Sequence, residues 1–177
     1  GVISNNGEGL AQYLNVETEL LARIHTFSKA LGCHGAIVLG SSVLRTYLIN
    51  FARSFIYTTA LSEHHLNTIE SAYKKLEKST DIIKKLHRNI SFFKSLISKN
   101  KIANLIESSS PIQCILIPKN ENVKIAANKL ITKGINVKPI LYPTVEKGKE
   151  RIRICIHSFN TEEQIKMCVI NLEKLYK

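Results

Sequence analysis

The run of residues 25–32 (HTFSKALG) brings a lysine, two hydroxyls and a glycine close together. A lysine such as Lys29 that forms a Schiff base must be neutral when it attacks, which requires a partly desolvated site or a neighbouring positive charge. The hydroxyls of Thr26 and Ser28 can donate to a phosphate, and the glycine lets the backbone approach a ligand closely. Taken alone, the spacing leaves open the commoner alternative of a surface lysine.

The elements expected around Lys29 are short. Residues 23–27 (RIHTF) predict a strand that leads into a glycine-rich turn, and residues 36–39 (AIVL) predict a buried strand. Ser41 can cap a helix that follows. Residues 56–60 (IYTTA) are rich in β-forming side chains and are expected to be extended.

The second half of the chain predicts a long helical stretch followed by short alternating units. Apolar side chains recur every three or four positions between residues 62 and 100, interrupted at residues 79–81, which predicts one long helix or two with a restart. Strands are then expected at residues 112–117, 137–141 and 151–157, with helices at residues 123–133 and after the capping box of Thr161 and Gln164. Pro139 places the middle strand at a sheet edge.

The composition permits one large domain or two small ones in 177 residues. With 44% hydrophobic residues the chain can build a core, and no apolar run approaches the ~20 residues of a membrane helix, so no membrane partner is expected. The N-terminus is polar and unlike a signal peptide, and it lacks an initiator methionine, so we expect a fragment of a longer protein.

The four cysteines are widely spread and form no CxxC pair. Three lie within apolar patterns, which favours buried free thiols and a reducing cytoplasm as the compartment. The six histidines show no ligand spacing, so no metal site is expected.

The formal charge of +11 favours anionic partners. The lysines are spread along the expected helices with few aromatic residues between them, and no nucleic-acid-binding motif accompanies them. We therefore expect a solvated helical face and no nucleic acid partner. A phosphate-rich small molecule would explain the positive charge equally well. A basic nucleic-acid-binding module and a structural or regulatory domain without chemistry remain lower-ranked alternatives.

Three blocks of the sequence resemble one enzyme family. Residues 26–32 (TFSKALG) resemble the cofactor-lysine motif of the α-oxoamine synthases, which are pyridoxal-phosphate enzymes of aminotransferase class II (fold type I). Residues 51–61 (FARSFIYTTAL) resemble the next family block. Residues 143–145 (PTV), Gly148 and residues 151–153 (RIR) resemble the third, and the order and spacing of the blocks agree throughout.

The resemblance implies a mixed α/β fold that corresponds to the C-terminal half of a family enzyme. Residues 1–78 would be the end of the pyridoxal-phosphate-binding large domain with its linking helix, and residues 79–177 a small C-terminal α+β domain. The family's aspartate on the pyridine nitrogen and its ring-stacking histidine would precede Gly1, since residues 1–9 (GVISNNGEG) resemble the stretch that follows that aspartate. We therefore expect the isolated chain to be catalytically inactive.

The resemblance also implies roles for the residues around the first block. Lys29 would hold pyridoxal phosphate covalently and later remove the α-proton of the substrate. Thr26 would bind the cofactor phosphate, with Ser28 as a weaker candidate because many relatives have glycine there.

The other two blocks would serve the partner subunit and the substrate. Thr59, with Thr58 as a second candidate, would reach the cofactor phosphate of the neighbouring subunit in a homodimer. Arg153 would hold the carboxylate of the amino acid, a task that suits the planar guanidinium group.

The implied reaction is a decarboxylating condensation of an amino acid with an acyl-CoA. Residues 57–59 (YTT) resemble the branch that uses L-alanine and pimeloyl-CoA in biotin synthesis more than the glycine C-acetyltransferase branch, which tends to have asparagine at the position of Thr59. Glycine C-acetyltransferase, serine palmitoyltransferase and 5-aminolevulinate synthase types remain alternatives within the family.

Overall fold

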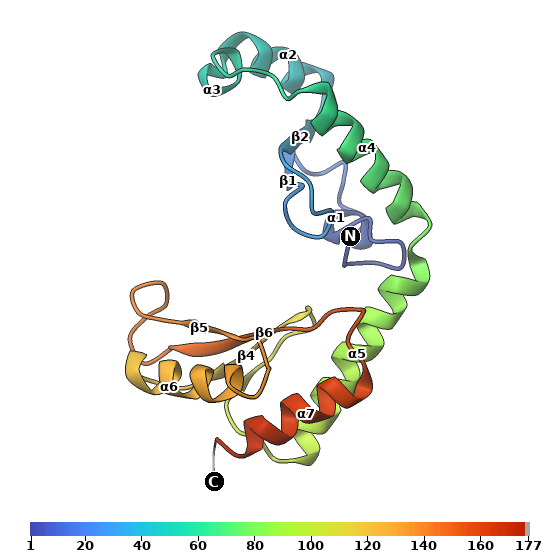
Figure 1. Cartoon of the computed structure of the whole chain (residues 1–177). Helices are drawn as coiled ribbons and strands as arrows, with labels where there is room; N and C mark the ends of the chain where they lie inside the picture. Colours follow the sequence, from blue (N-terminus) through green and yellow to red (C-terminus); the bar gives the residue numbers. More distant parts are fainter. Residues whose placement is uncertain (176–177) are drawn as a thin grey trace. The chain divides into compact units, whose positions relative to one another are not determined.

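The computed structural model describes residues 1–175, which form two compact units, Gly1–Ile83 and the residues from Lys84 onwards (Figure 1). The boundary expected after residue 78 lies between helices α4 (Glu63–Glu77) and α5 (Thr80–Lys99). The structure confirms that helix formation restarts there, because α4 ends at its C-cap Lys78 and the amide of Ile83 donates to the carbonyl of Ser79 (3.1 Å) as a new helix begins.

The first unit contains a two-stranded antiparallel sheet of β1 (Ala22–Thr26) and β2 (Ala36–Gly40). Ile24 lies opposite Val38 in this ladder, so both predicted strands are confirmed. The predicted burial of β2 is wrong, because three of its first four side chains are exposed. An apolar run of this kind is typical of a strand covered on both faces, and residues 1–175 do not cover these side chains.

Four helices complete the first unit: α1 (Leu10–Tyr13), α2 (Ser42–Phe51), α3 (Arg53–Ile56) and α4. The Ser41 side chain accepts a hydrogen bond from the amide of Leu44 (3.1 Å), as expected for the cap of α2. The expectation that residues 56–60 are extended is wrong at its start, because Ile56 ends α3. The amide of Tyr57 donates to the carbonyl of Arg53 (3.1 Å), so local helical hydrogen bonds override the β propensity of the segment.

The second unit is a four-stranded sheet in the order β3-β4-β6-β5 with helices α5, α6 and α7. Its strands are β3 (Leu105–Ile106), β4 (Ile112–Leu116), β5 (Lys138–Ile140) and β6 (Arg151–Cys155). Figure 1 shows α6 (Asn120–Ile131) and α7 (Glu162–Glu173) on the same side of this sheet. β5 lies at the edge, as Pro139 predicted, whereas the short strand β3 was not expected.

The core of the second unit follows the alternation of β6. Ile152, Ile154 and Ile156 are buried against apolar residues of α5, α6 and α7. The capping box of Thr161 and Gln164 begins α7 as predicted. Because alternate side chains of a strand point to opposite faces, the residues between these isoleucines lie on the other face of the sheet.

Candidate functional site

The turn after β1 carries Lys29 and is closed by backbone hydrogen bonds. The amide of Phe27 donates to the carbonyl of Gly35 (2.9 Å), and the amide of Cys33 donates to the carbonyl of Phe27 (2.9 Å). The carbonyl of Lys29 itself accepts from the amide of Gly32 (3.1 Å), whose φ of 64° lies in the left-handed region that favours glycine. The backbone of the lysine is therefore held, but its side chain is exposed, so residues 1–175 by themselves do not form the partly desolvated site expected for a Schiff-base lysine.

A small buried cluster fixes this turn to α4. Phe27 is 4% exposed and packs with Cys33 and Ile69. Its ring meets the ring of Tyr73 edge-to-face, with the centroids 6.1 Å apart. A hydrogen bond from the Cys33 thiol to the carbonyl of Leu31 (3.2 Å) adds to the closure. The turn is thus held in place because Phe27, the residue directly after β1, is inserted into the core of the unit.

The structure brings Thr26, Ser28 and Lys29 together at this turn. Thr26 and Ser28 flank the buried Phe27 in sequence, and both of their side chains are exposed together with that of Lys29. Within residues 1–175 no ion pair involves Lys29. The three side chains therefore present an amine and two hydroxyls at the end of β1.

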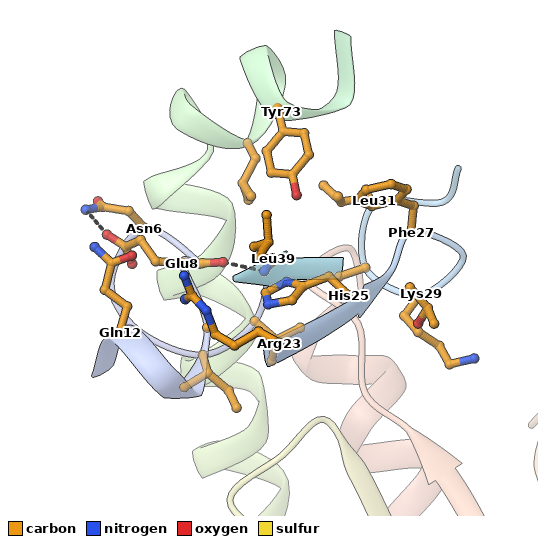
Figure 2. A pocket seen from close by; sticks show the side chains of 18 of the residues that line it. Asn6, Glu8, Gln12, Arg23, His25, Phe27, Lys29, Leu31, Leu39 and Tyr73 are labelled. Atoms are coloured by element: carbon orange, nitrogen blue, oxygen red, sulfur yellow. Dashed lines mark hydrogen bonds between the residues drawn. The ribbon is translucent and has the colours of Figure 1, made fainter. Parts of the chain in front are cut away.

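A hollow of about 880 Å³ lies beside the turn in the first unit, with Lys29 at one side. Figure 2 shows Arg23, His25 and Glu8 on the other side, with the amine of Lys29 pointing away from them. Hydrogen bonds from Ser4, from its own backbone amide and from Asn6 lower the pKa of Glu8 to about 2, so this carboxylate is ionised at neutral pH.

Thr58 and Thr59 follow α3 and are both exposed. The hydroxyl of Thr58 donates to the carbonyl of Ser54, one helical turn earlier. No hydrogen bond of the Thr59 side chain occurs in the part of the chain that the structure describes. Thr59 is therefore the freer donor of the two.

Arg153 lies in the second unit, on the open face of its sheet. It is exposed on β6 and stands directly opposite Cys114 of β4 on one side and Lys138 of β5 on the other. Burial raises the pKa of the Cys114 thiol, and the nearby guanidinium groups of Arg151 and Arg153 partly offset this rise. Neither Lys138 nor Arg153 forms an ion pair within residues 1–175.

The sequence pattern did not identify Lys138 as a site residue. The alternation of apolar side chains along β6 does predict the position of Arg153. Because Ile152, Ile154 and Ile156 are buried on one face, Arg153 and Cys155 lie on the opposite face. The pairing of Lys138 with Arg153 needed the strand register, which the sequence does not specify.

Neither a metal centre nor a membrane span is found in the described part of the chain. No group of three or more histidine, cysteine, aspartate or glutamate side chains among residues 1–175 could hold a metal ion. No helix among those residues is both long and apolar enough to cross a bilayer.

Comparison with known proteins places these residues in a family. The model of the aminotransferase class I and II family matches residues 4–171. The 8-amino-7-oxononanoate synthase of Emericella nidulans is 38% identical over 173 residues, which cover 93% of this chain and 41% of that protein. The synthase of the same name from Petrotoga mobilis is 35% identical over 177 residues, which cover 100% of this chain and 45% of that protein.

A solved structure shares the fold. The 8-amino-7-oxononanoate synthase of Francisella tularensis superposes with a TM-score of 0.87 at 30% identity, over 98% of this chain and 51% of that one. The predicted mixed α/β fold class is thereby confirmed. The chain spans less than half the length of the two curated relatives.

Proposed function

The chain belongs to the class I and II aminotransferase family, and from this premise we propose that it carries the cofactor lysine of a pyridoxal-phosphate-dependent 8-amino-7-oxononanoate synthase. The single observation that carries this proposal is the turn after β1, which holds the backbone of Lys29 and exposes its amine beside two hydroxyls. The similarity to the synthases of Emericella nidulans and Petrotoga mobilis supports the choice within the family.

The residues of the turn fit pyridoxal phosphate. Lys29 offers an amine without a competing ion pair within residues 1–175, and Thr26 and Ser28 offer hydroxyl donors for a phosphate. Gly35 has a φ of 108°, a backbone conformation that residues with a side chain rarely adopt, so a substitution there would strain the turn. The turn thus depends on glycine at a position that keeps the lysine in place.

Each residue then has a defined task. Lys29 Nζ would be the attachment point of the cofactor, and the same amine, once free again, would take the α-proton of the amino acid. Thr26 Oγ1, with Ser28 Oγ as a second donor, binds the phosphate and orients the group beside the lysine. When bound, pyridoxal phosphate supplies the electron sink for the carbanion that loss of the proton creates. Arg153 would bind the substrate carboxylate through its guanidinium group.

The proposed substrates are L-alanine and pimeloyl-CoA, whose condensation releases CoA and carbon dioxide. Residues 57–59 (YTT) favour this pair over the other α-oxoamine synthase types, which remain the second candidate function. We propose a homodimer in which Thr59 reaches the cofactor phosphate of the partner subunit, because its hydroxyl has no partner within residues 1–175. The free thiols of Cys114 and Cys155 suit a reducing compartment such as the cytoplasm.

The proposal is tested by comparing pyridoxal phosphate with pyridoxal, which lacks the phosphate. Binding of each compound to the chain is measured by the change in absorbance of its aldehyde when the aldehyde reacts with an amine. We expect pyridoxal phosphate to bind more tightly than pyridoxal by about tenfold, as charge-assisted hydrogen bonds to the phosphate would give. The Thr26→Val variant should lose most of this difference, and Lys29→Ala should lose the absorbance change.

Lys75→Ala is the matched control, because Lys75 is an exposed lysine of the same unit on α4. It should bind both compounds as the unmodified chain does. An absorbance change that persists in Lys29→Ala, or an equal loss in Lys75→Ala, contradicts the assignment of Lys29.

A further inference from the structure

Three histidines lie together where the turn that carries Lys29 meets the start of α4. The rings of His34, on the turn, and His65, on α4, have their centroids 5.1 Å apart and their planes tilted by 49°. The ring of His64 meets that of His65 edge-to-face, with the centroids 6.0 Å apart. We call these three side chains the histidine cluster. None of the three has a task in the proposed reaction.

A hydroxyl holds the central ring of the cluster. Ser62 Oγ lies 2.8 Å from His65 Nδ1, and the two atoms share a hydrogen bond. Ser62 is the N-cap residue of α4, but its side chain forms no capping hydrogen bond to the helix backbone. The hydroxyl that would ordinarily cap the helix therefore orients the ring that contacts the turn.

The contact between His34 and His65 is a second connection between the turn and α4, beside the buried apolar cluster around Phe27. The amide of Cys33, the residue before His34, donates to the carbonyl of Phe27 (2.9 Å) and closes the turn. Movement of His34 therefore acts directly on the backbone that positions Lys29.

The surroundings of the histidine cluster disfavour positive charge. Its two α4 members lie in the first turn of that helix, where the helix dipole is positive. No carboxylate within residues 1–175 lies within ion-pair distance of any of the three rings. The other ionisable side chains of the adjoining segments are Lys29 and Cys33 of the turn, Tyr57 of the segment before α4, and Glu63 beside the histidines.

We infer that the histidine cluster is a pH-sensitive latch, which holds the Lys29 turn on α4 when its rings are neutral and releases the turn when they are protonated. Imidazoles ordinarily gain a proton between about pH 5 and 8. Neutral rings pack against each other, whereas protonated rings 5.1 Å apart repel each other and the helix end.

The direction of the pH effect follows from proton binding. The open turn binds more protons than the closed turn, so closure is fully present above the range in which the imidazoles titrate and is lost as pH falls through that range. The latch acts on a cofactor through the position of Lys29, and this consequence alone rests on the proposed function.

Hydrogen exchange of the turn amides tests the latch without any cofactor. The amides of Gly32 and Cys33, which are bonded within the turn, are followed at about pH 7.5 and about pH 5, with correction for the intrinsic exchange rate at each pH. We expect the equilibrium constant for opening to rise about tenfold at the lower pH, the order expected for two like charges this close near a protein surface. In His34→Gln and His65→Gln, which remove one titrating ring each, it should rise by less than about twofold.

His25→Gln is the matched control, because His25 lies on β1 in the same unit and no ring contact joins it to the cluster within residues 1–175. This variant should keep the tenfold response, and salt at about 1 M should reduce that response in the unmodified chain by screening the charges. Equal opening of the unmodified turn at both pH values, an unchanged response in His65→Gln, or a response that salt leaves unaltered overturns the inference. The measurement needs no pyridoxal phosphate, so failure here is distinct from failure of the cofactor assignment at Lys29.

Discussion

At the scale of single residues, the degree of burial distinguishes two of the four free thiols. Cys155 is exposed on the open face of the second sheet, whereas Cys168 is buried on α7, where burial raises its pKa to about 12. Only the thiolate is a nucleophile, so Cys168 is unreactive near neutral pH although its thiol is free.

The pKa of Cys168 predicts a pH dependence of stability. The ordinary pKa is 9.0, so this thiol ionises in the unfolded chain above about pH 9 but in the folded chain only near pH 12. The contribution of the neutral Cys168 thiol to the stability of the folded chain is therefore fully present below pH 9 and is lost as pH rises toward 12. Between pH 8 and pH 10, the free energy of unfolding measured by urea titration should fall by about 1 kcal/mol less for Cys168→Ala than for the unmodified chain.

Cys155→Ala serves as the control for this series. Cys155 is exposed, so the variant removes a thiol from the same unit without opening a buried cavity. Equal slopes for all three proteins would show that Cys168 ionises as readily folded as unfolded.

The residues that surround Lys29 can be predicted from the sequence better than those that surround Arg153. The lysine, its hydroxyls and its glycines are adjacent in sequence, so their grouping needs one turn and no long-range pairing. Lys138 lies opposite Arg153 through strand register, and the side chain of Asn89, 64 positions before Arg153, holds the turn after β6 by hydrogen bonds to the carbonyls of His157 and Asn160. Neither interaction leaves a local pattern in the sequence.

At the scale of elements, local signals predict the ends of helices well. Ser41, Thr161 and Gln164 cap the helices that their spacing indicated, because caps depend on residues three positions apart. The exposure of β2 could not be predicted, because burial depends on what packs against a strand and not on the strand itself. Thr58 shows the same limit, since its hydrogen bond to Ser54 closes a helical turn where the side chains favour a strand.

The capping box of α7 predicts a measurable loss of stability. The Thr161 hydroxyl accepts from the amide of Gln164 (3.2 Å), and the Gln164 side chain accepts from the amide of Thr161 (3.1 Å). Thr161→Ala should therefore lower the free energy of unfolding by about 1 kcal/mol in urea titrations. Ser98→Ala, at an exposed position near the end of α5, should change it by less than about 0.5 kcal/mol. A loss no larger than that of the control would show that the box contributes nothing.

At the scale of the whole molecule, the two units differ in the size of their cores. The buried cluster of the second unit draws on α5, β4, α6, β6 and α7, whereas that of the first unit consists of Phe27, Cys33 and Ile69 with a few partly buried neighbours. Ile24 of β1 is 73% exposed, and a two-stranded ribbon without a covering layer is marginally stable in water.

Hydrogen exchange should reflect this difference. We expect the amides of β1 and β2 to exchange at least about 100-fold faster than those of β4 and β6, because local opening of the first sheet exposes little additional apolar surface. Mass spectrometry of peptides after exchange measures both sheets in one sample. Equal protection of the two sheets would mean that the exposed side chains of β1 and β2 are covered in solution, for example by a second copy of the chain.

The measurement that tests the central claim most directly is the location of the reduced cofactor adduct. The chain is mixed with pyridoxal phosphate, treated with borohydride to make the bond to the amine permanent, digested and mapped by mass spectrometry, with Lys29→Ala alongside. We predict one dominant adduct at Lys29 that disappears in the variant. Adducts scattered over the lysines of α4 and α5, unchanged in Lys29→Ala, would contradict the account.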